Sequence, residues 1–397
     1  MRRYEFPILA ALFLDLIGFG MAFPDVQIRA EKLGAPGWGI GLLLASLFAV
    51  QFFASPRWGR LSDRIGRKPV VIICTLLSAA SMLVYALTNS LEGILFSRVL
   101  AGLAAANVVV AQAYMAEHTS ESERGGAMGR IGAAISVGLI GGPFVGGQLV
   151  QIGGSHLLGL VAASASGLGA LILFVGMKGL KPDEAREPGK APVIDFRLLK
   201  DIPRLAPLFL IAAVSWFALA CLEGTFGRLL EARFHFPNSD LGATFTLPQG
   251  ASGAIFGLES LIAFVVQGIL YERATKRFGE KPLLTVGFLL QGAGLVCTPF
   301  APGLALVAVA SGIYSLGAAL GGPAINSLCS NMTPESRQGE LFGLLQASRS
   351  IGFLVGPMIG GILFDAWIPG PYVLAGAIAI VATLLVARVK IDPAVAS

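Results

Sequence analysis

A few ionisable side chains lie inside long apolar segments of this chain, where charge is unexpected. Five stand out: Asp15, Arg98, Glu223, Glu259 and Arg349. A charge in the middle of a membrane span costs about 3 kcal/mol or more, so such residues usually serve a function. A carboxyl group there can exchange a proton or bind a cation, whereas a guanidinium can pair with an acid or an anion. These residue types predict the transfer of ions or solutes.

The composition predicts the kind of element that holds these residues. Of 397 residues, 55% are hydrophobic and 13% are charged, and the mean hydropathy is +0.75. About a quarter of the residues in a soluble globular protein are charged. This balance excludes an ordinary soluble domain and predicts an all-α polytopic membrane protein. Twelve spans of about 20 residues would use about 240 residues and leave the rest for loops.

Twelve apolar segments can be followed along the chain. The predicted spans are 6–23, 38–53, 69–87, 91–116, 126–150, 156–175, 205–230, 252–270, 282–298, 304–328, 339–366 and 372–389. Most of the 29 Lys and Arg residues lie in alternate loops, and basic residues stay on the cytoplasmic side. We therefore expect both termini and the central loop to be cytoplasmic, in the inner (plasma) membrane. The same alternation argues against a nucleic-acid surface.

An internal repeat divides the chain. Residues 136–147 read SVGLIGGPFVGG, and residues 350–361 read SIGFLVGPMIGG. Six spans separate the copies, so the two halves share one orientation, and such halves typically enclose a site at their interface near the middle of the membrane. We predict an N-terminal six-helix bundle at 1–176, a cytoplasmic linker at 177–204 and a C-terminal six-helix bundle at 205–397.

Four motifs carry a family resemblance. They are LDLIGFGMAFP at 14–24, GRLSDRIGRKPVV at 59–71, RVLAG at 98–102 and the glycine-proline motif of the first repeat copy. Together they resemble the signature motifs of the major facilitator superfamily, and more narrowly its twelve-helix drug:proton antiporters. The stretch ATKRFGEKP at 274–282 is similar to the tetracycline-exporter branch. The resemblance implies the major facilitator fold, with twelve transmembrane helices in two six-helix bundles.

The resemblance assigns two groups of structural residues. A cytoplasmic latch, in which an acid faces the N-terminal end of the eleventh helix, would use Gly59, Asp63, Arg64, Gly66, Arg67, Arg124 and Arg130. The antiporter motif consists of Gly138, Gly142, Pro143, Gly146 and Gly147. Its glycines allow close helix packing and its proline removes a backbone donor. The alternatives are a loop that only sets topology and a motif that only packs.

The remaining candidates are expected to carry protons or substrate. For proton coupling we predict Asp15, Glu223, Glu259 and Arg98, the last matching the arginine of the family's fourth-helix motif. For substrate binding we predict Asp15, Trp216, Glu223, Glu259, Gln291, Tyr314, Gln346 and Arg349. Two alternatives stay open: Asp15 forms a permanent ion pair with an arginine, or Arg349 pairs with one of the acids instead of binding an anionic group.

The sequence thus predicts a proton-coupled exporter of small, amphipathic, drug-like organic molecules. Its partners would be the substrate, protons and the lipid bilayer, with no nucleic acid, as a monomer, and without a cofactor other than the coupling proton. Tetracycline exporters carry acids in the third and ninth spans, where this chain has Met82 and Gln291, which argues against a metal-chelated tetracycline. The alternatives are a symporter or uniporter of a metabolite and a transporter-like receptor or sensor. The sequence lacks the HExxH, P-loop and GxSxG motifs, so an enzyme is not expected.

Overall fold

The computed structural model describes residues 5–117, 121–178, 197–234, 248–334 and 338–388, and all regular structure in these ranges is helical. Ten helices in these ranges are long and apolar enough to cross a membrane, and Gly370–Val386 is a shorter apolar helix. The chain is therefore a multi-pass, all-helical membrane protein, as its composition predicted.

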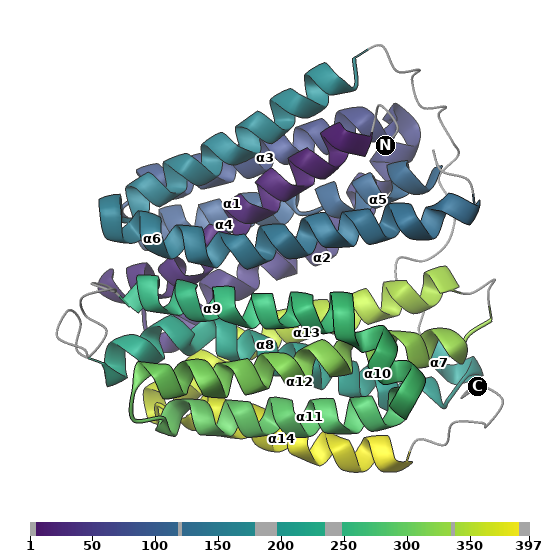
Figure 1. The fold of residues 1–397 in the computed structure, drawn as a ribbon. Helices are drawn as coiled ribbons and strands as arrows, with labels where there is room; N and C mark the ends of the chain where they lie inside the picture. The colour runs from purple at the N-terminus through teal and green to yellow at the C-terminus, as the bar shows by residue number, and fades with distance from the viewer. Residues whose placement is uncertain (1–4, 118–120, 179–196, 235–247, 335–337, 389–397) are drawn as a thin grey trace. The chain divides into compact units, whose positions relative to one another are not determined.

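The helices follow one another along the chain (Figure 1). In the first part of the chain they are α1 (Glu5–Lys32), α2 (Gly37–Ile65), α3 (Arg67–Leu87), α4 (Leu91–Ala104), α5 (Asn107–Glu117) and α6 (Glu121–Gly176). In the second part they are α7 (Arg197–Asp201), α8 (Leu205–Arg233), α9 (Pro248–Val265), α10 (Tyr271–Phe278), α11 (Glu280–Cys297), α12 (Leu304–Asn331), α13 (Gln338–Ala366) and α14 (Gly370–Arg388). A π-helical turn (Val266–Leu270) joins α9 to α10, and a 3-10 turn (Thr298–Phe300) follows α11.

The chain forms two compact units. Unit 1 comprises residues 1–35, 46–191 and 245–257, and unit 2 comprises residues 36–45, 192–244 and 258–397. The start of α2 therefore belongs to unit 2, and the start of α9 belongs to unit 1. In unit 1, α6 packs along α1 and α3; in unit 2, α11 packs along α12 and α14, and α8 along α13 (Figure 1). Each unit has its own buried aliphatic core.

Two predicted boundaries differ from the structure. The first span does not stop at residue 23: α1 continues through Pro24 to Lys32, so Asp25 and Arg29 lie in a helix and not in an external loop. The predicted fourth span is interrupted after Ala104, and Asn107 starts a new helix. By contrast, the predicted gap between the fifth and sixth spans is confirmed, because Gly153 and Gly154 have non-helical backbone angles inside α6.

Candidate functional site

In unit 1 the Asp15 carboxyl is surrounded by uncharged donors. Asp15 is only 4% exposed. Ser166 of α6 donates its hydroxyl to Oδ1 (2.7 Å), Asn107 of α5 donates its amide to Oδ2, and Ser78 of α3 lies within hydrogen-bonding range. These donors can stabilise the charged carboxylate, and their hydroxyl oxygens can accept from the protonated acid. Asp15 can therefore change its protonation state without leaving a cation unpaired.

Small residues allow this arrangement. One turn beyond Asp15, the Cα of Gly18 faces the Ala162 carbonyl and the Ser166 hydroxyl, and an added Cβ would lie 3.1 Å from that carbonyl oxygen. The break after Ala104 places Asn107 in the first turn of α5, directed at Asp15. No arginine is among the described partners of Asp15, so the structure offers no support for the alternative of a permanent ion pair.

Arg98 instead belongs to a second polar cluster in unit 1. Its guanidinium lies 5.2 Å from the Tyr85 ring centre, and the Arg29 guanidinium lies 4.7 Å from the same ring. The Tyr85 hydroxyl donates to Asp25 (2.6 Å), and Asp25 lies within electrostatic range of Arg98. Asp25, Tyr85 and Arg98 are each at most 2% exposed. The described acid nearest to Arg98 in this cluster is thus Asp25, which sequence reasoning missed.

In unit 2 the predicted arginine lies against aromatic rings. The Arg349 guanidinium is 4.8 Å from the Trp216 ring centre and 5.6 Å from that of Phe353. The two rings are themselves 6.0 Å apart. Arg349 also lies within electrostatic range of Glu223. Glu223, Trp216 and Arg349 are all partly exposed.

A second acid completes this cluster. Glu259 of α9 is 8% exposed and lies within electrostatic range of Glu223. The Ser311 hydroxyl lies within range of this carboxyl group, but Oε1 and that hydroxyl make no well-aligned hydrogen bond among the described residues. Ser315 of α12 donates to the backbone carbonyl of Glu259. A buried carboxyl oxygen without a donor is costly, so Glu259 is suited to take a proton or a cation.

Most of the predicted substrate-binding residues of unit 2 meet in this place. Gln291 of α11 donates to Ser215 (3.3 Å) and lies beside the Tyr314 hydroxyl. The unit 2 acid cluster, as we call it below, consists of Trp216, Glu223, Glu259, Gln291, Tyr314, Arg349 and Phe353. The side chain of Gln346 lies outside the described residues. With both acids ionised, the described side chains of this cluster have two negative charges and one positive charge, so one added proton or cation would balance them.

The loop between α2 and α3 has the backbone that its glycine motif predicts. Gly66 has a φ of 95°, a conformation that side chains other than glycine rarely adopt. Arg67 donates to the Ser62 hydroxyl and to the Gly59 carbonyl, so it closes the turn, and Arg64 is exposed. The side chains of Asp63 and Arg124 lie outside the described residues, and their latch role stays a prediction. Arg130 pairs with the buried Glu5 of α1 at 3.0 Å.

The glycines of the antiporter motif bring helices into backbone contact within unit 1. An added Cβ on Gly138, Gly142 or Gly146 would meet α1, at Phe13 to Met21. Gly147 faces the Gln249 carbonyl, and Gly253 faces the Pro143 carbonyl, at distances that leave no room for a Cβ. The start of α9 therefore rests on this motif.

The glycines of the second copy of the motif pack against the start of α2 in the same way, within unit 2. Gly41 faces the Pro357 carbonyl, and Gly361 faces the Gly37 carbonyl. Hydrogen bonds add to this contact: the Asp365 carboxylate accepts one from the Gly37 backbone N–H (2.7 Å) and one from an N–H of Arg228 (2.9 Å). Arg228 lies in α8 and is 6% exposed. A carboxylate at a helix N-terminus is stabilised by the helix dipole.

Comparisons with known proteins agree with this architecture. The family model described as Major Facilitator Superfamily matches residues 8–273 and 234–397. The chain is 31% identical over 382 residues to multidrug resistance protein 2 of Bacillus subtilis (strain 168), covering 94% of this chain and 92% of the relative. It is 30% identical over 371 residues to the class C tetracycline resistance protein of Escherichia coli, covering 90% and 89%.

The solved structures extend the comparison to the fold. The crystal structure of the human organic anion transporter MFSD10 (TETRAN) superposes with a TM-score of 0.67 at 23% sequence identity. The superposition covers 97% of this chain and 99% of that chain. At this identity the likeness shows a shared fold.

Proposed function

Because this chain belongs to the major facilitator superfamily, we propose that it exports small, amphipathic organic cations in exchange for protons by alternating access. That it is a membrane transporter and not an enzyme follows from the family. Relatives named for multidrug and tetracycline resistance support drug-like cargo. Proton coupling and the choice of cations go further than the family does and depend on this chain's own residues.

The observation that carries the proposal is the unit 2 acid cluster. Glu223 and Glu259 lie close enough to repel each other, and one arginine offsets only part of their charge. Trp216 and Phe353 provide aromatic faces, which attract cations, and Arg349 already lies against both rings. Such a cluster binds either a proton or an organic cation well and both together poorly, which is the competition that an antiporter requires.

Asp15 supplies a second proton site in this proposal. Its neutral hydrogen-bond partners allow it to be charged or protonated. A ligand shifts a conformational equilibrium only through its different affinity for the two states. We assign that difference to protonation of Asp15 together with at least one of Glu223 and Glu259: protons entering from outside release the cargo, and their loss to the inside permits the next load.

The topology proposed with this mechanism has twelve transmembrane spans in the inner (plasma) membrane, with both termini cytoplasmic. Its support is the sequence distribution of Lys and Arg. The non-helical break at Gly153 and Gly154 divides α6 into two of these spans. The linker at 177–204 would then be cytoplasmic, and Asp63 and Arg124 would lie on the same side.

Transport in inverted membrane vesicles tests the proposal. Tetraphenylphosphonium, a permanent apolar cation, would be the probe, and an imposed pH gradient would be the driving force. The wild-type protein should accumulate the probe, and the triple variant Asp15→Asn, Glu223→Gln, Glu259→Gln should not. Glu92→Gln is the matched control, because Glu92 is exposed in the first turn of α4. Accumulation by the triple variant at the wild-type level would refute the mechanism.

A further inference from the structure

Four arginines of the described helices are at least partly buried and lie against aromatic rings: Arg29, Arg98, Arg228 and Arg349. The first three also donate hydrogen bonds, to backbone carbonyls or to side-chain oxygens. Arg349 donates none to a described residue, and its described contacts are two aromatic rings and the attraction of Glu223. An arginine has five N–H donors, yet ring contact and charge, and not hydrogen bonds, set the position of this one.

The two rings lie on a closely packed pair of helices, α8 and α13. An added Cβ on Gly352 of α13 would come 2.6 Å from the Cβ of Trp216 on α8, and Gly356 makes a similar contact with α8 one turn later. Phe353 follows Gly352 in the chain and is only 3% exposed. Such close contact leaves the backbone that carries the rings little freedom. The guanidinium of Arg349 is therefore the part of this site that can move at the least cost.

Arg349 occupies the position that a bound organic cation would take. Its guanidinium lies 4.8 Å from the Trp216 ring centre and 5.6 Å from that of Phe353. The face of an aromatic ring attracts a guanidinium and an organic cation through the same electrostatic interaction, up to about 6 Å from the ring centre. A cargo cation that contacts both rings from this position must therefore displace Arg349.

Glu223 can receive the displaced guanidinium. It lies seven residues after Trp216 on α8, about two turns along the same face, and it already attracts Arg349. An ion pair between Arg349 and Glu223 would compensate one of the two acids of the cluster. The charge of Glu259 would remain, and a cation on the rings would balance it. The described charges thus allow a cargo cation to replace Arg349 on the rings without an excess of charge.

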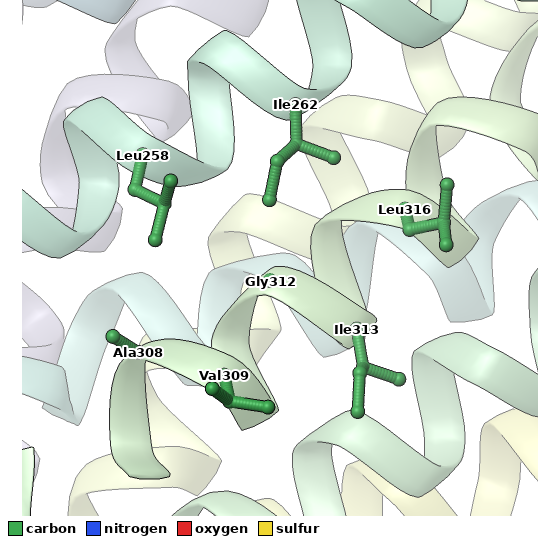
Figure 2. A pocket seen from close by; sticks show the side chains of 7 residues that line it. All are labelled: Leu258, Ile262, Ala308, Val309, Gly312, Ile313 and Leu316. Carbon is green, nitrogen blue, oxygen red and sulfur yellow. The ribbon is translucent and has the colours of Figure 1, made fainter. Parts of the chain in front are cut away.

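A groove between α9 and α12 offers no comparable selection. Its volume is about 440 Å³, and its walls are aliphatic side chains, such as Leu258 and Val309, and the backbone of Gly312 (Figure 2). Such walls do not distinguish a cation from a lipid chain, because lipid tails are as apolar as leucine. Selection among cations therefore falls to the rings and acids of the unit 2 acid cluster.

We propose that Arg349 is a tethered competitor of the cargo: it occupies the faces of Trp216 and Phe353 when the site is empty, and it yields them to an organic cation by moving toward Glu223. The inference rests on the proposed function for its cargo class and adds the residue that limits affinity. A cation that binds the rings weakly cannot displace Arg349, so the site favours cations with a large aromatic or apolar part. The return of Arg349 to the rings also helps to release the cargo.

Equilibrium binding of labelled tetraphenylphosphonium to the full chain in nanodiscs tests the competitor. Arg349→Gln should bind the probe about fivefold more tightly, which corresponds to about 1 kcal/mol. In a Trp216→Leu background the same substitution should change the affinity less than about twofold, because the larger ring face is absent; such a double-mutant cycle isolates the coupling of the two residues. Structural damage weakens binding and therefore cannot imitate the gain.

Arg277→Gln is the matched control. Arg277 also lies against an aromatic ring, 5.3 Å from the centre of Phe278, but it is exposed on α10, which contributes no residue to the unit 2 acid cluster. The substitution removes the same charge from unit 2, and the affinity for the probe should stay within about twofold of the wild-type value. Thermal unfolding of each variant checks that it is folded.

The outcomes separate this inference from the proposed function. Unchanged or weaker binding by folded Arg349→Gln would overturn the inference, even if pH-driven export persists. An equal gain in the Trp216→Leu background would also overturn it, because Arg349 would then only repel the cation. A gain that depends on Trp216, in a protein that shows no pH-driven transport, would support the competitor and refute the proposed exchange. If the wild-type protein and all variants fail to bind the probe, the proposed cargo class and the inference are both wrong.

Discussion

Asp15 in unit 1 has hydrogen-bond donors for both of its carboxyl oxygens, whereas Glu259 in unit 2 has the Ser311 hydroxyl nearby, no well-aligned donor for Oε1 among the described residues, and a second acid close to it. The partners of Asp15 are small and uncharged, and they come from helices in backbone contact. Glu223, by contrast, lies near Arg349, whose guanidinium lies against the rings of Trp216 and Phe353. The first acid is buried among small neutral donors, whereas the second pair lies beside an arginine and a tryptophan that are partly exposed.

This difference indicates how the two functions of an antiporter can be divided. A site that must bind many organic cations needs space, aromatic faces and charge that is not fully compensated. A site that binds only protons needs precise neutral donors and no space. The following predictions test whether the two units differ in this way.

The largest effect is expected for Asp15→Asn. The amide keeps the shape of the side chain but cannot titrate, so pH-driven accumulation of tetraphenylphosphonium should fall about tenfold or more, the coupling free energy being about 1 to 3 kcal/mol. Binding of the probe without a gradient should change less than about twofold. Vesicle transport and nanodisc binding measure the two quantities. Normal accumulation would show that Asp15 is not a coupling site.

Substitutions in unit 2 should show the reverse pattern. Glu259→Gln should weaken binding of tetraphenylphosphonium about tenfold, because the uncompensated charge is removed. Glu223→Gln should weaken binding about threefold, since Arg349 already offsets part of its charge. Equilibrium binding of the labelled probe measures both. Equal losses in Asp15→Asn and Glu259→Gln would remove the distinction between the units.

Substitution of the same two acids, Asp15 and Glu259, should have different effects on the stability of the protein. Asp15→Asn places an amide against two donors, and we expect it to lower the free energy of unfolding by about 1 to 2 kcal/mol. Glu259→Gln removes a buried charge near a like charge, so it should raise the thermal midpoint or leave it unchanged. Unfolding in the same detergent compares the two variants. A lower midpoint for Glu259→Gln would mean that the acid is stabilised by groups outside the described residues.

One ion pair in each unit offers a smaller contrast. In unit 2 the Asp365 carboxylate accepts hydrogen bonds from the Gly37 backbone N–H at the start of α2 and from Arg228. Asp365→Asn should cost about 1 kcal/mol of stability, because the Asp365 side chain is 39% exposed and solvent screens the pair. Arg130→Gln, which breaks a pair whose arginine is 42% exposed, should cost about 0.5 kcal/mol or less. If the order of the two is reversed, the carboxylate at the start of α2 contributes no special stability.

The sequence predicted much of the fold because composition and periodicity act locally. Long apolar runs placed the helices, and the repeat of the glycine-proline motif predicted two related regions. It did not predict that α1 continues past Pro24, because proline and Asp25 normally mark the end of a span. The extra turns bring Asp25 and Arg29 to Tyr85, a contact between residues 60 positions apart that no local pattern encodes.

The candidate site was predictable where a charged residue lies within an apolar segment of the sequence. Asp15, Glu223, Glu259 and Arg349 are charges in apolar segments, and the last three are brought together in unit 2. Asn107 and Ser166, which surround Asp15, are ordinary polar residues in a membrane helix, and only the packing of α5 and α6 against α1 identifies them. An amide directly before the apolar run VVVA was the one available signal for Asn107.

Proton release during binding tests the central claim most directly. Tetraphenylphosphonium is added to the purified protein in weakly buffered solution without a gradient, and released protons are followed with a pH indicator over a range of pH. If proton and cation compete at Glu223 and Glu259, the wild-type protein and Asp15→Asn should both release protons on binding, and the double variant Glu223→Gln, Glu259→Gln should release none. Binding by the wild-type protein without proton release at any pH would contradict the account.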